Sequence, residues 1–123
     1  MLFAIGLGGA LGSVARYLIG TLVAGRPGGF PWATLAINVS GSLVLGFLVR
    51  YLADPAQSPV MRAALTVGFC GGYTTFSTFS FEMLDLLERG SYGRAGGYAT
   101  LSVALSIAAA AAGAAFARVL RPA

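Results

Sequence analysis

Glycines and hydroxyl side chains gather within one apolar segment, at positions 68–80. Gly71 and Gly72 are adjacent, and threonine or serine stands at positions 74, 75, 77, 78 and 80. Two adjacent glycines cost a helix about 2 kcal/mol relative to alanine, at roughly 1 kcal/mol each, and neighbouring hydroxyls compete for backbone hydrogen bonds. The pattern predicts either a kinked, continuous helix or an unwound stretch whose freed carbonyls face a cation.

Phenylalanine and asparagine residues in apolar surroundings could bind a small anion. Phe76 and Phe79 are three residues apart and therefore share one helix face, and aromatic rings carry positive edges. Thr34 and Asn38 are four residues apart on another helix, where a buried amide offers two hydrogen-bond donors. Contact with lipid or with other helices is the competing interpretation for the phenylalanines.

Further polar residues recur at helical spacing inside apolar segments. Tyr98, Ser102 and Ser106 repeat every four residues, which predicts either a polar pathway or contacts between helices. Arg16 needs a carbonyl or anion partner, or must reach the membrane interface, so its role is structural or that of an anion vestibule. Glu82 lies nearest the core among the acidic residues of its segment, and it is the one acidic residue there with a candidate functional role.

The residue types that the chain lacks argue against several classes of function. The chain has no histidine and one cysteine, so neither a Ser/His or Cys/His pair nor a zinc or copper site is expected. It has no phosphate-binding glycine loop, and we do not expect an enzyme. The net charge of +4 comes from arginines set mostly singly rather than in a run, which argues against nucleic-acid binding.

The overall composition indicates a lipid environment. Of the 123 residues, 57% are hydrophobic and 10% are charged, whereas a soluble domain carries about 25% charged residues. One span of the hydrocarbon core needs about 20 apolar residues. We therefore expect an all-α membrane protein with a single domain, 1–123. Its four transmembrane helices are predicted at 2–24, 31–53, 60–88 (broken near 71–75, at Gly71-Gly72) and 94–118.

The distribution of arginines bears on orientation in the membrane. With four spans, four arginines fall on the side that holds both termini and three on the other side, Arg16 lying within a span. The positive-inside rule orients a chain by this difference, and a difference of one is a weak signal. We therefore predict dual topology, in which opposite orientations pair as an antiparallel homodimer, with one weakly favoured orientation as the alternative.

Three segments, at 8–17, 34–42 and 68–82, resemble the Fluc family of fluoride channels, also called CrcB. The third segment, GFCGGYTTFSTFSFE, is the longest and most specific of them. The resemblance covers nearly the whole chain. It implies passive fluoride export across the bacterial inner membrane, through a dual-topology homodimer with two pores. It also implies a structural sodium ion at the centre of the dimer.

The resemblance assigns roles to individual residues. The sodium ion would be held by the backbone carbonyls of Gly71 and Thr74 in each subunit. Arg16 and Glu82 would be vestibule or structural residues. The implied residues of the fluoride pore are Thr34, Asn38, Thr75, Phe76, Phe79, Tyr98, Ser102 and Ser106.

Two other classes of membrane protein are consistent with the predicted arrangement of spans. A small proton-coupled multidrug transporter also has four spans and dual topology, but it needs a carboxylate in its first span. This chain has Arg16 there and no acidic residue before Asp54. A membrane scaffold subunit without transport activity is the remaining alternative.

Overall fold

Every regular element is a helix in the computed structural model, which describes residues 1–121 of the chain. Within these residues, three helices are long and apolar enough to cross a membrane: α1 (Leu2–Val23), α2 (Trp32–Tyr51) and α6 (Tyr92–Leu120). They correspond to three of the four predicted spans, and the prediction of an all-α membrane protein is confirmed. The region of the remaining predicted span, the third along the chain at 60–88, contains α3 (Pro59–Ala63), the π-helix η1 (Ala64–Cys70), α4 (Gly71–Tyr73) and α5 (Phe76–Glu88).

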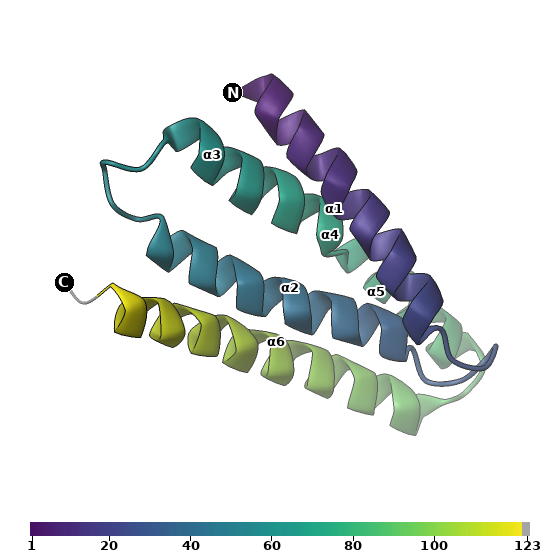
Figure 1. Cartoon of the computed structure of the whole chain (residues 1–123). Coiled ribbons are helices and arrows are strands. Elements are labelled where there is room, and N and C mark those ends of the chain that lie inside the picture. The colour runs from purple at the N-terminus through teal and green to yellow at the C-terminus, as the bar shows by residue number, and fades with distance from the viewer. Residues whose placement is uncertain (122–123) are drawn as a thin grey trace.

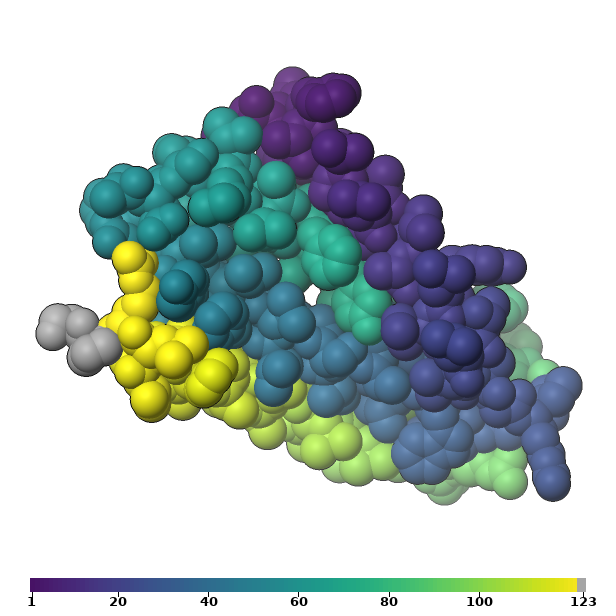
Figure 2. Space-filling view, viewed as in Figure 1, coloured from purple at the N-terminus to yellow at the C-terminus, as the bar shows by residue number. Residues whose placement is uncertain are grey.

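The helices form two side-by-side pairs (Figure 1). One pair is α2 with α6, and the other is α1 with the continuous helical segment from α3 to α4. The two members of each pair run in the same direction, and α2 lies between α6 and the other pair (Figures 1 and 2). The C-terminal end of α6 meets the end of α2, where Arg121 Nη1 donates to the Tyr51 carbonyl at 2.9 Å.

Glycines allow α2 and α6 to approach each other backbone to backbone. A Cβ atom at Gly46 would collide with the backbone of Ala110, and one at Gly113 would collide with the backbone of Leu43. Small residues at such positions are the usual means of close helix packing in lipid, where the hydrophobic effect does not drive association. The same pair of helices supplies several residues of the site described below, so this contact sets the width of that site.

Gly46→Val is therefore expected to lower the free energy of unfolding by about 1–3 kcal/mol, the usual cost of overpacking. Thermal unfolding in detergent measures the change. Gly96→Val is the matched control, because a Cβ atom at Gly96 meets nothing within 4 Å and the helix-propensity cost is the same. Equal unfolding temperatures for the two variants would contradict the packing role of Gly46.

The helical backbone is interrupted at Thr74 and Thr75, which are extended (φ −78°, ψ 156° and φ −150°, ψ 114°). The break therefore lies within the predicted range 71–75, but not at Gly71-Gly72, since both glycines belong to α4 and Gly71 has helical angles (φ −65°, ψ −36°). Gly72 serves packing instead, because a Cβ atom there would collide with the backbone of Gly9 on α1. The backbone leaves the helix where side chains can replace its hydrogen bonds.

Candidate functional site

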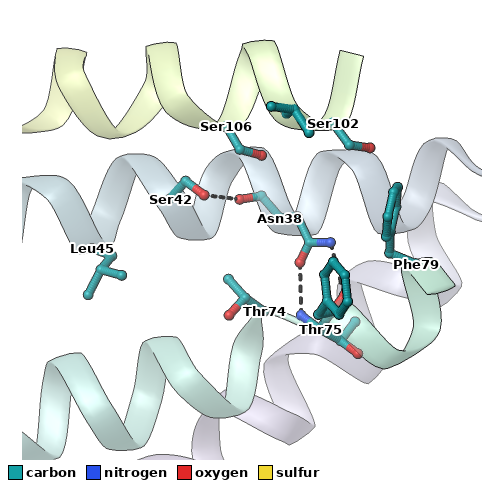
Figure 3. A pocket seen from close by; sticks show the side chains of 10 residues that line it. Asn38, Ser42, Leu45, Thr74, Thr75, Phe79, Ser102 and Ser106 are labelled. Carbon is teal, nitrogen blue, oxygen red and sulfur yellow. Dashed lines mark hydrogen bonds between the residues drawn. The ribbon is translucent and has the colours of Figure 1, made fainter. Parts of the chain in front are cut away.

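A cavity of about 290 Å³ opens between α2, α6 and the start of α5 (Figure 3). We call it the phenylalanine groove. It brings together six of the predicted pore residues from three separate elements. Its lining consists of Asn38, Ser42, Leu45, Thr74, Thr75, Phe76, Phe79, Ser102, Val103 and Ser106.

The side chain of Asn38 holds the interruption in the helix through two hydrogen bonds to the backbone of Thr75, an arrangement that we call the Asn38 clamp (Figure 3). Its Oδ1 accepts a hydrogen bond from the Thr75 backbone N–H at 2.8 Å, and its Nδ2 donates to the Thr75 carbonyl at 3.0 Å. The side chain of Thr75 in turn caps α5, since its Oγ1 accepts from the Thr78 N–H at 3.2 Å. Asn38 thus satisfies both backbone groups of a buried residue, and within residues 1–121 it donates only one of its two amide hydrogens, which leaves the other for a ligand.

The same hydrogen bonds release two backbone carbonyls from the helical ladder. In a continuous helix the Gly71 carbonyl would accept from the Thr75 N–H, but that N–H is bound to Asn38. The Thr74 carbonyl would accept from the Thr78 N–H, which is bound to the Thr75 side chain. The released carbonyls are those of the two residues predicted as sodium ligands, so the local backbone fits such a role.

Phe76 and Phe79 lie on the groove side of α5, in its first turn. Their ring centroids are 5.5 Å apart and their planes are inclined by 37°. Phe76 is 78% exposed, whereas Phe79 is half-buried and meets the Tyr98 ring edge-on at 5.0 Å and 60°. Because the helix begins at Phe76, both rings project beside the interruption rather than from the middle of a helix.

Ser102 and Ser106 line the groove from α6. Ser102 is 9% exposed, and among residues 1–121 its hydroxyl has no hydrogen-bond partner. A buried, unpaired hydroxyl costs about 1–3 kcal/mol, so an anion or a water molecule in the groove would relieve this cost. The third member of the predicted stripe, Tyr98, differs from the two serines because it is fully buried and does not line the groove.

Tyr98, Thr34 and Glu82 form a separate cluster at the end of the stripe. The Tyr98 hydroxyl donates to Glu82 Oε2 at 2.6 Å, and Thr34 Oγ1 donates to Glu82 Oε1 at 2.7 Å. The sequence did not predict that these three side chains contact one another. The spacing gives a signal for two of them, since Thr34 and Tyr98 each lie four residues before a groove residue, Asn38 and Ser102 respectively, and so one turn nearer the same end, but it does not point to Glu82.

Arg16 lies apart from the phenylalanine groove, in a second cavity of about 500 Å³ between α1, α2 and the start of α5. Hydroxyl side chains of all three elements accompany it, including Ser13, Thr34 and Thr78. Thr75 lines both cavities, so the clamped interruption forms the partition between them. The predicted residues are thus divided between a groove, a carboxylate cluster and an arginine-lined cavity.

Comparison with known proteins shows which family the chain belongs to. The family model described as "CrcB-like protein, Camphor Resistance (CrcB)" matches residues 3–114. The chain is 49% identical to fluoride-specific ion channel FluC 1 of Nitrobacter hamburgensis, over 97% of the chain and 96% of that protein. It is 47% identical to the FluC channel of Rhizobium meliloti, over 94% of each, and 47% identical to that of Thermus thermophilus, over 84% of the chain and 83% of the relative. The chain therefore belongs to the CrcB family, as the resemblance of its three motifs predicted.

Proposed function

We propose that this protein is a fluoride-selective channel that lets fluoride leave the cell passively and so lowers cytoplasmic fluoride. The observation that carries the proposal is the phenylalanine groove, in which two rings and the unpaired hydroxyl of buried Ser102 meet at the clamped interruption. The relatives named fluoride-specific ion channels cover nearly the full chain. Their names describe channels rather than enzymes.

The groove offers what a small, strongly hydrated anion needs. Moving such an ion out of water costs on the order of tens of kcal/mol unless other groups replace its hydration shell. The second amide hydrogen of Asn38, the hydroxyls of Ser102 and Ser106, and the positive ring edges of Phe76 and Phe79 supply replacements. Several weak sites in series, rather than one tight site, allow the ion to leave again.

We propose a different role for Thr34 and Tyr98 from that of pore residues, which the resemblance implies. Both hydroxyls already donate to Glu82, so we assign them to holding the end of the polar stripe rather than to the groove itself. Arg16 provides positive charge in the second cavity, where it would attract anions toward the partition at Thr75.

The proposal is tested by purified protein in vesicles loaded with potassium fluoride, with valinomycin to carry the compensating potassium, and with and without a proton ionophore. A passive channel releases fluoride down its gradient, and the release persists when the ionophore collapses the proton gradient. A proton-coupled transporter would depend on that gradient, and a scaffold subunit would release no fluoride. Either of the latter two results would overturn the proposal.

We further propose that two chains pair in opposite orientations in the bacterial inner membrane. In each chain the elements from α3 to α5 would act together as the third, interrupted membrane span. A sodium ion between the chains would be held by the released carbonyls of Gly71 and Thr74. In support, Gly71 is exposed and the N–H groups that would otherwise occupy these carbonyls are bound elsewhere. Bound sodium would supply fixed positive charge next to both anion paths.

Removal of sodium is therefore expected to weaken the dimer. A ligand that binds only the assembled state stabilises it by mass action, so exchange of sodium for N-methyl-D-glucamine at equal ionic strength should raise the monomer fraction. Light scattering or single-molecule subunit counting in detergent measures this fraction. Return of sodium should restore the dimer, and a dimer fraction independent of sodium would contradict the proposed site.

A further inference from the structure

We propose that Phe30 is a positioning residue for the fluoride path, acting through Tyr98 on the ring of Phe79. Phe30 lies in the connection between α1 and α2, outside the helices that line the groove. The inference rests on the function proposed above. Its basis is a continuous row of aromatic rings that leads from this connection to the phenylalanine groove.

The rings follow one another at contact distance. Phe30 lies 4.5 Å from Trp32 and 5.5 Å from Tyr98, measured between ring centroids. Tyr98 lies 5.0 Å from Phe79, which lies 5.5 Å from Phe76. The planes of Phe30 and Phe79 meet the plane of Tyr98 at 71° and 60°, which is the edge-to-face arrangement that aromatic pairs prefer. The Tyr98 ring is thus contacted edge-on by a loop residue and by a groove residue.

Tyr98 is held at both ends of its side chain. Its ring is fully buried, and its hydroxyl is fixed by the hydrogen bond to Glu82 at 2.6 Å. With Cβ and the hydroxyl both anchored, the motion left to the ring is rotation about the axis that joins them. The contacts with Phe30 and Phe79, together with the packing of the core cluster around the ring, set this rotation, so removal of Phe30 loosens one side of the Tyr98 ring and, through it, the direction of the Phe79 edge.

The direction of that edge matters to an anion. An aromatic ring has a positive edge and a negative face, so rotation of Phe79 would replace attraction by repulsion at the same place in the groove. Phe30 is itself held in position, because the connection between α1 and α2 that contains it is fixed by hydrogen bonds. The Phe30 carbonyl accepts from the Trp32 N–H at 2.9 Å, and the nearby Gly28 carbonyl accepts from Arg94 Nη1 at 3.4 Å.

Fluoride efflux from vesicles tests the inference with two substitutions and one rescue. Phe30→Leu keeps an apolar side chain but removes the ring, and we expect fluoride flux to fall about fivefold. Phe30→Tyr restores the ring and should stay within about twofold of the unmodified protein. Phe47→Leu is the matched control, since Phe47 is also a half-buried aromatic residue but stacks on Tyr51 (5.1 Å) at the far end of α2. All three variants should keep the unfolding temperature of the unmodified protein.

A double-mutant cycle separates positioning from general stability. Tyr98→Leu removes the ring through which Phe30 acts, so Phe30→Leu should cause no further loss in that background. Equal loss in both backgrounds, normal flux in Phe30→Leu, or equal loss in Phe47→Leu would overturn the inference. If Tyr98→Leu does not fold, the comparison of Phe30→Leu with Phe47→Leu still decides it. Absence of flux from the unmodified protein would instead overturn the proposed function.

Discussion

Asn38→Asp is expected to lower fluoride flux by about 100-fold or more. The substitution replaces the Nδ2 donor that binds the Thr75 carbonyl with an oxygen, so that two acceptors face each other at the partition between the cavities. It also places a negative charge in the groove. A unit charge about 4 Å from the anion costs about 4 kcal/mol at an effective dielectric constant of about 20, and each 1.36 kcal/mol changes a rate about tenfold.

Ser40→Ala is the control for this variant. Ser40 lies on the same helix, and its hydroxyl bonds the Ile37 carbonyl and the Tyr73 hydroxyl outside the groove. Its fluoride flux in vesicles should match that of the unmodified protein. Gel filtration should show both variants at the size of the unmodified protein, and a freely conducting Asn38→Asp variant would show that the clamp is unnecessary.

Phe76→Ile is expected to slow fluoride flux about tenfold or more while the fold is retained. Isoleucine keeps apolar bulk but has no positive ring edge, and loss of about 1.5 kcal/mol of ring interaction corresponds to about tenfold in rate. Stability should change little, because Phe76 is 78% exposed and buries little apolar surface within the chain.

The neighbouring Phe81 provides the comparison for Phe76. It lies on the same helix, is 71% exposed, and does not line the groove. Phe81→Ile should therefore conduct fluoride at the unmodified rate in the same vesicle assay. If Phe76→Ile and Phe81→Ile conduct equally well, the rings of the groove do not bind the permeating ion.

The long helices, the family and the approximate position of the break, near 71–75, were predictable from the sequence, but the two residues at which the helix is interrupted were not. Apolar runs of about 20 residues identify α1, α2 and α6 without knowledge of their neighbours. The break at Thr74 and Thr75 depends on a side chain 37 positions away, since Asn38 supplies the hydrogen bonds that the backbone loses. Local propensity pointed to Gly71 and Gly72, but Gly72 lacks a side chain because it packs against the backbone of Gly9, and a Cβ atom at Gly71 would meet nothing within 4 Å.

The grouping of the site residues was only partly predictable. Spacing placed Phe76 and Phe79 on one face, and the structure brings them to one groove with Ser102. Spacing could not reveal that Tyr98 leaves this set to bind Glu82, because the stripe is regular in sequence and the carboxylate comes from another helix. Pairings between helices depend on how the helices are rotated and shifted against each other, which the period of one helix does not specify.

The central claim is that the protein conducts fluoride and excludes chloride, and paired efflux assays test it most directly. Vesicles that contain the purified protein are loaded with either potassium fluoride or potassium chloride, and valinomycin carries the compensating potassium. Ion-selective electrodes then record anion release. We predict rapid fluoride efflux together with chloride efflux no faster than from protein-free vesicles. Equal release of the two ions, or no release of fluoride, would contradict the account.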